Sequence, residues 1–173
     1  MEMEAMGKQQ REEALLRAAS DGNLRLLKKM ARWMGSAGQG EGAVLAAVED
    51  GQGDRALHLA AGAGRVEVCR YLVEDLRLDV NQLNFIGDTP LFLSATYGRA
   101  DAARYLLDHG ADPLAGKLHS PLCGAAMQGL SVCLFVIYIY VCVCVCVCVC
   151  VCVCVCVCVC VCQCIHSQFD FLP

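Results

Sequence analysis

The stretch from residue 87 to residue 113 constrains the fold most, because it encodes two short helices together with their start and stop signals. Thr89 is a favourable N-cap, and Pro90 suits the first helical position, where a missing N–H is tolerated. Leu91 continues the apolar pattern, and Gly98 favours the end of this helix because glycine readily adopts positive φ. The pattern therefore predicts a first helix that starts at Thr89–Pro90 and stops near Gly98.

A second helix is predicted directly after Gly98. Asp101 is positioned to cap it, and its apolar face contains Ala103, Leu106 and Leu107 at helical spacing. Gly110 ends it before the turn-forming Asp112–Pro113 pair. The whole stretch is thus one helix–turn–helix unit followed by a turn.

This unit recurs along the chain in register. A Leu followed seven residues later by Gly occurs four times, and the leucines are separated by 42, 34 and 31 residues: Leu15/Gly22, Leu57/Gly64, Leu91/Gly98 and Leu122/Gly129. The segment Thr89-Pro90-Leu91-Phe92 resembles the T-P-L-H opening of an ankyrin repeat, and Gly110-Ala111-Asp112 resembles its end. The resemblance implies an all-α ankyrin-repeat solenoid with β-turn fingers, acting as a non-enzymatic scaffold for protein–protein interaction.

The repeat register divides the chain. We expect a disordered N-terminus (1–11), an ankyrin-repeat domain (12–129), an apolar tract (130–162) and a tail (163–173). The repeat domain is expected to contain units at 12–34, 53–86 and 87–117, a truncated unit at 118–129 and a Gly-rich insertion at 35–42. The insertion lacks a following Gly-Lys-Ser/Thr and a preceding strand, so it is interpreted as a flexible linker rather than a phosphate cradle.

Charge and leader signals narrow the function classes. The residues before position 130 include all 14 Lys and Arg of the chain and 17 of its 18 Asp and Glu. The repeat region therefore has three more acidic than basic residues. This excludes a typical nucleic-acid-binding domain, which needs a basic excess. The N-terminus lacks a basic region followed by an apolar core, so a cytoplasmic or nuclear location is expected. Cys69 and Cys123 are expected to be reduced, buried residues.

The resemblance also assigns structural roles. The residues that match the family's motif are Leu57, His58, Gly64, Thr89, Pro90, Leu91, Gly98 and Gly110. For His58 the family role is a hydrogen bond that ties the turns of adjacent repeats together. A metal-binding or catalytic role for His58 is disfavoured, because no other ligand-type residue lies at helical spacing from it. We therefore expect no catalytic, cofactor-binding or metal-binding residue.

The finger at residues 81–88 is the candidate partner-binding element. Ankyrin proteins bind partners through finger tips and inner helices, and aromatic anchors are frequent hot spots. The candidate partner-binding residues are Asn84, Phe85, Ile86, Asp88, Phe92 and Tyr97. The alternative is that Phe85 and Ile86 lean onto the inner helices of the neighbouring unit.

The tract at 130–162 ends in eleven Val-Cys pairs, preceded by two Ile-Tyr pairs. GTGTGT and ATATAT repeats encode these pairs, which favours translated non-coding DNA such as a retained intron. The tract has 33 uncharged residues, more than the roughly 20 that cross a bilayer, so a membrane anchor is the alternative. Soft-metal binding by its thiolates is disfavoured, because uniform Val spacing gives neither tetrahedral closure nor a second shell. Cross-β aggregation is a further interpretation.

The sequences of the repeat helices look most like those of plant ankyrin proteins, which continue into more repeats and sometimes a TPR segment. Proteins of that kind act as adaptors. The prediction is therefore an adaptor that binds another protein, present here as a fragment of a longer repeat protein. The alternative is a tail-anchored membrane protein whose repeats face the cytosol.

Overall fold

The computed structural model describes residues 6–35, 38, 40–116 and 121. Within these residues it contains helices and turns but no strand, so the expected all-α class is confirmed there. The elements in chain order are α1 (Lys8–Asp21), α2 (Leu24–Gly35), α3 (Glu41–Ala47), α4 (Ala56–Ala63), α5 (Val66–Arg70), the π-helical turn η1 (Tyr71–Asp75), α6 (Pro90–Thr96) and α7 (Ala100–Asp108). None of these helices is long and apolar enough to cross a membrane.

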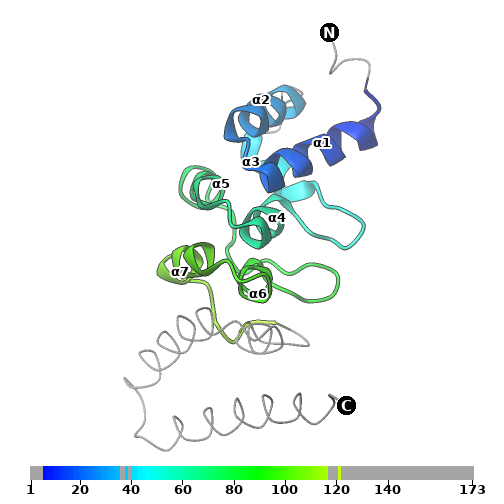
Figure 1. Cartoon of the computed structure of the whole chain (residues 1–173). Helices are drawn as coiled ribbons and strands as arrows, with labels where there is room; N and C mark the ends of the chain where they lie inside the picture. Colours follow the sequence, from blue (N-terminus) through cyan, green and yellow to red (C-terminus); the bar gives the residue numbers. More distant parts are fainter. Residues whose placement is uncertain (1–5, 36–37, 39, 117–120, 122–173) are drawn as a thin grey trace, which may run out of the picture.

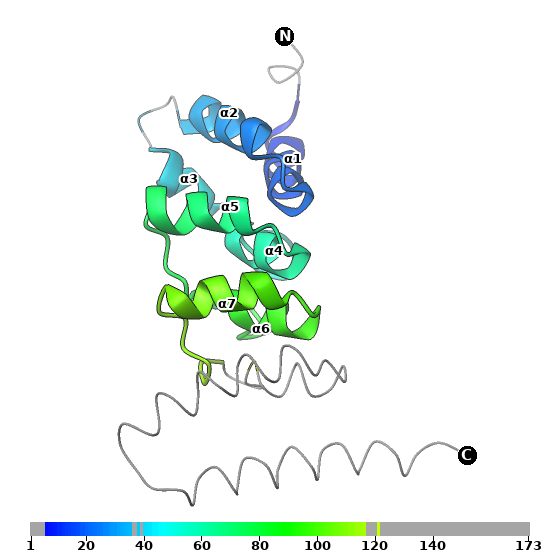
Figure 2. The same ribbon diagram turned by 60° about the vertical axis from the view of Figure 1, so that its left-hand side comes forward.

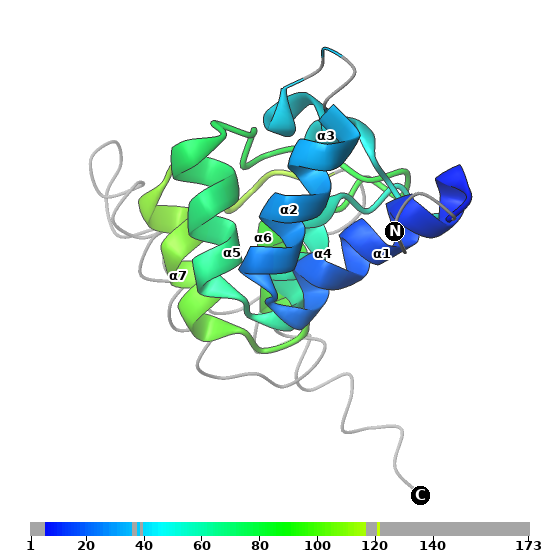
Figure 3. The ribbon, with the colours of Figure 1, turned by 90° about the horizontal axis from the view of Figure 1, so that it is seen from above.

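The helices form two layers (Figures 1 and 2). Helices α1, α4 and α6 stack on one another as the inner layer, while α2, α5 and α7 form the outer layer. Two loops, one before α4 and one before α6, project from the inner layer in Figure 1 and are the fingers. Seen along the stack in Figure 3, α2, α5 and α7 are progressively displaced from one another. Each unit therefore contacts the next with a small offset, as in other solenoids.

Leucines at equivalent positions form the core between the units. Leu15, Leu57 and Leu91 of the inner helices are all 0% exposed, as are Leu27, Leu72 and Leu106 in the outer layer. The Leu that defines the repeat register is thus the residue on which each inner helix packs. Cys69 is buried among these residues as a free thiol, and burial raises the pKa of Cys69 to about 12.

The N-terminal helix begins earlier than the sequence indicated. The expected disorder of residues 1–11 is wrong for residues 8–11, because α1 starts at Lys8. The Gly7 N–H donates to Gln10 Oε1 at 3.1 Å, and Lys8 pairs with Glu12 one turn later at 3.8 Å. These contacts stabilise the first turn, so the polar residues there extend the helix.

The predicted helix signals of the third unit are partly confirmed. Thr89 Oγ1 accepts the Phe92 N–H at 3.1 Å, and Pro90 occupies the first helical position. The expected cap at Asp101 is wrong, because α7 starts at Ala100 and Arg99 precedes it without a side-chain cap. Asp101 instead lies in the first turn, where its charge is favourable to the helix dipole.

Other boundaries are shifted by a few residues. The Gly-rich insertion expected at 35–42 is shorter, because α2 extends to Gly35 and α3 begins at Glu41. Arg32 Nε donates to Glu41 Oε1 at 2.7 Å across this loop, which joins the two helices. The truncated fourth unit (118–129), Cys123, the tract at 130–162 and the tail at 163–173 lie outside the described residues, apart from Pro121, which is buried.

Candidate functional site

The two fingers have the same backbone geometry because one side-chain oxygen organises each of them. Asp50 Oδ1 accepts the N–H groups of Gln52 and Asp54 at 2.8 and 2.9 Å. In the next finger Asn84 Oδ1 accepts three N–H groups at 2.8–3.0 Å, those of Ile86, Gly87 and Asp88. Such local bonds fix tight turns without a strand. The fingers are therefore shaped by short polar side chains.

Successive fingers are joined to each other at their tips and bases. The Phe85 N–H donates to the carbonyl of Gln52 at 3.0 Å, and Asn84 Nδ2 donates to Asp54 Oδ1 at 2.8 Å. The Phe85 ring lies over Gly53, where an added Cβ would be 2.6 Å from Phe85 Cδ1. Gly53 also has a φ of 80°, which favours glycine. Phe85 thus packs on the preceding finger.

His58 connects the start of α4 to the second finger. Its Nδ1 accepts the Arg55 N–H at 3.3 Å, and its Nε2 lies 3.1 Å from the Gln82 carbonyl and 3.3 Å from the Asp88 carbonyl. This arrangement assigns the proton to Nε2, because carbonyls only accept. The imidazole is 0% exposed, and burial lowers the pKa of His58. A neutral His58 therefore caps α4, which lacks the Thr-Pro start, and holds the next finger.

A groove of about 450 Å³ lies between the fingers and the inner helices. Asp54, His58, Asn84 and Asp88 line it near the finger bases. Further along the inner helices the lining residues are mostly small or apolar: Leu59, Gly62, Ala63, Phe92, Leu93, Thr96 and Tyr97. Ser20, Gln52 and Arg99 complete the lining, so the groove combines apolar side chains with several polar groups, as ligand-binding clefts do.

The structure separates the expected partner-binding residues into two groups. Phe85, Ile86 and Tyr97 are 67%, 46% and 61% exposed, and Phe92 is half-buried in the groove. Asn84 and Asp88 are only 7% and 8% exposed. The Asn84 side chain is engaged within the finger, so its visible function is to hold that turn. Contact between these residues and a partner stays a prediction.

Tyr97 occupies a second glycine-supported position. An added Cβ on Gly62 would be 3.3 Å from Tyr97 Cδ2, so the ring of α6's C-cap residue lies against the preceding inner helix. Gly62 therefore permits the close approach, while most of the ring remains open to solvent. Phe85 and Tyr97 are both exposed aromatic residues with one face supported by the preceding unit.

The sequence reasoning missed an arginine that links each unit to the one before it. Arg65 Nε donates to the Ser20 carbonyl at 2.9 Å, and Arg99 Nε donates to the Gly62 carbonyl at 3.2 Å. The signal was present, because each of these arginines directly follows a helix-ending glycine, Gly64 for Arg65 and Gly98 for Arg99.

The motif residues occupy structural positions. Leu57, His58, Thr89, Pro90 and Leu91 are buried, whereas Gly64, Gly98 and Gly110 have φ values of 75°, 69° and 88°. Among the described residues, no group of three His, Cys, Asp or Glu side chains could hold a metal ion.

The repeated geometry agrees with a comparison against family models. A model described as "Ankyrin repeats (3 copies)" matches residues 15–117, which is more than half of the chain and extends from within α1 to beyond the end of α7. A search of curated proteins found no match. Ankyrin-repeat domains are in general protein–protein interaction modules and are typically non-catalytic. With its stacked helical pairs, ordered fingers and matching family model, this chain belongs to the ankyrin-repeat family.

Proposed function

We propose that this chain is a non-enzymatic adaptor, and that its groove binds a segment of another protein through an apolar residue placed between the finger tip and α6. The observation that supports it is the pair of exposed aromatic rings, Phe85 and Tyr97, each supported by a glycine of the preceding unit. Rings fixed in this way lose little conformational entropy on binding, and aromatic residues dominate binding hot spots.

Backbone hydrogen bonds hold the finger so that the Phe85 side chain stays exposed. Its backbone N–H is bonded to Gln52, and Ile86 beside it is bonded through its N–H to Asn84 Oδ1. The finger therefore presents two large apolar side chains from a backbone that is ordered before a partner arrives. Preorganisation of this kind raises affinity by reducing the ordering cost.

The test is a double variant, Phe85→Ser with Ile86→Ser, compared with Leu114→Ser. Leu114 is 64% exposed and lies after α7, outside the finger that carries Phe85 and Ile86, so it controls for general loss of surface hydrophobicity. Proteins captured by the unaltered chain are identified, and each affinity is measured by calorimetry. We expect the double variant to weaken binding by about 1 kcal/mol or more while its melting temperature changes little. A lower melting temperature with unchanged affinity would support a packing role instead.

The membrane-anchored alternative depends on the 33 uncharged residues at 130–162. Fractionation of cells that express the chain with and without residues 130–173 separates a cytoplasmic or nuclear adaptor from a tail-anchored one. In parallel, we propose that the dominant transcript joins Gly129 to a second apolar helix and lacks the Val-Cys codons, as expected for a fragment of a longer repeat protein. A dominant transcript that retains these codons in frame would contradict this and favour the anchor.

A further inference from the structure

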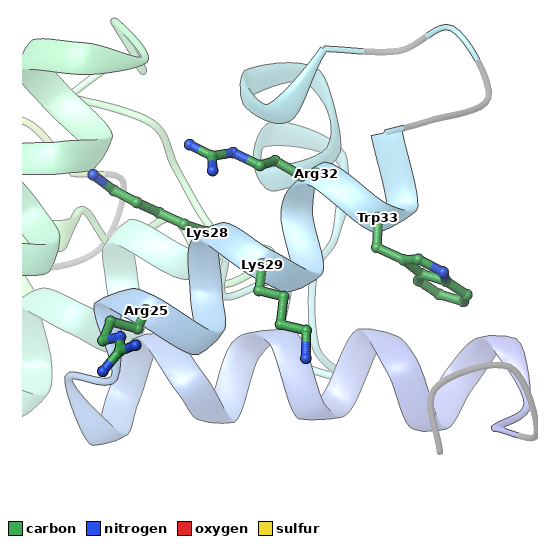
Figure 4. A pocket seen from close by; sticks show the side chains of 5 residues that line it. All are labelled: Arg25, Lys28, Lys29, Arg32 and Trp33. Carbon is green, nitrogen blue, oxygen red and sulfur yellow. The ribbon is translucent and has the colours of Figure 1, made fainter. Parts of the chain in front are cut away.

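The outer surface of α2 carries a second, different candidate site (Figure 4). Its shallow pocket of about 570 Å³ is lined by Arg25, Lys28, Lys29, Arg32 and Trp33. The helix contains no acidic residue, whereas the whole chain has a net charge of −4. The charge of this surface is therefore opposite in sign to the net charge of the chain, which favours an anionic partner there.

The four cations fall into two rows with different environments. Lys28 and Arg32 extend from one side of α2 in Figure 4 and already have anionic partners. Lys28 Nζ lies 3.9 Å from Asp75 and 4.2 Å from the centre of the Tyr71 ring, while Arg32 is bonded to Glu41. This row is used to hold α2 against the following elements.

The second row contains Arg25 and Lys29, with Trp33 next along the helix. These residues are spaced at i, i+4 and i+8, and all three extend from the other side of α2 in Figure 4. Both cations are exposed, and neither forms an ion pair with any residue in the described part of the chain. One i, i+4 step along a helix is about 6 Å, so the two cationic side chains leave α2 about one turn apart on the same face.

We infer that this row, Arg25–Lys29–Trp33, docks an acidic segment of a partner protein that carries two carboxylates about 6 Å apart, next to an apolar residue that contacts Trp33. Charge complementarity identifies the segment, and the Arg11 guanidinium, 4.9 Å from the centre of the Trp33 ring, adds a third positive charge near the apolar end. The site lies in the outer layer, so it goes beyond the groove function and does not depend on it.

The geometry favours a peptide segment over an anionic membrane or a small anion. Membrane-binding surfaces of this kind use about four to eight cations, and here two of the four α2 cations are neutralised within the protein. The side chains of the two rows also diverge in Figure 4 and do not converge on one point, which a single phosphate would require.

The test uses the full chain under reducing conditions and a fluorescent helical peptide with Glu at i and i+4 and Leu at i+8. A second peptide with Gln in place of both Glu is its control. We expect the Glu peptide to bind, the Gln peptide to bind at least tenfold more weakly, and raised salt to weaken the Glu peptide. Charge reversal by Arg25→Glu with Lys29→Glu should lower affinity for the Glu peptide at least tenfold.

Two matched variants complete the design. Arg17→Glu with Arg104→Glu changes the net charge by the same amount at exposed positions on α1 and α7, and should leave peptide affinity within twofold. Phe85→Ser with Ile86→Ser should also leave the affinity for the Glu peptide within twofold, which separates this site from the groove. Equal loss in both charge-reversal variants, or equal binding of the Gln peptide, would overturn the inference. Binding to vesicles with anionic lipid, but not to the Glu peptide, would also overturn it.

Discussion

Replacing Gly53 by Ala tests whether the packing of Phe85 on the preceding finger contributes to the stability of the fold. Gly53 has a φ of 80°, a conformation that costs an L-residue about 1–2 kcal/mol. The new Cβ would also lie 2.6 Å from Phe85 Cδ1 and 2.8 Å from the Phe85 backbone nitrogen. A ring can rotate away, but a backbone nitrogen bonded to Gln52 cannot move without displacing the finger. Overpacking of this kind costs about 1–3 kcal/mol.

The expected loss of unfolding free energy is therefore about 2–5 kcal/mol, the sum of the backbone and overpacking costs. Gly51→Ala is the matched control in the same finger, because its Cβ would meet no atom within 4 Å and its φ is not positive. That change should be neutral or stabilise the fold by about 0.4–1 kcal/mol. Urea unfolding followed by circular dichroism measures both. A loss in Gly53→Ala no larger than the backbone cost alone, about 1–2 kcal/mol, would refute the argument that Phe85 packs on Gly53.

Three further substitutions test the core, the buried histidine and the inter-unit arginine. Leu91→Ala should cost about 2–5 kcal/mol, because Leu91 is 0% exposed, and an unchanged denaturation midpoint would contradict its position in the core. Burial lowers the pKa of His58, so below the ordinary value of 6.5 the unfolded chain binds a proton that the folded chain does not. The free energy of unfolding should therefore fall as the pH drops below about 6.5. His58→Gln should make this fall smaller in denaturation curves measured from pH 7.5 to 5. Arg99→Met removes the hydrogen bond to the Gly62 carbonyl and should cost about 1 kcal/mol in thermal unfolding, whereas a loss of the same size in exposed Arg104→Met would show that the bond is not the cause.

The repeat architecture could be predicted because its signals are local. Thr89 and Pro90 start α6, and the Leu-to-Gly spacing gives each inner helix its buried residue and its end. These effects act within one or two turns of the same helix, so they depend little on the neighbouring units. The same reasoning failed at Lys8 and Asp101, where the helix starts a few positions earlier than its predicted signal.

The candidate groove was decided by contacts between units, which the sequence by itself does not reveal. Phe85 lies on Gly53 and Tyr97 lies against Gly62, pairs separated by 32 and 35 residues. The offset between stacked helices determines which glycine faces which ring, and therefore which aromatic side chains stay exposed. The sequence determined where α6 begins, that the inner helices end near a glycine and which leucine each of them buries, because those effects are local. The tertiary structure alone decided that Asn84 faces inward while Phe85 faces outward, because that depends on the packing of one finger against the next.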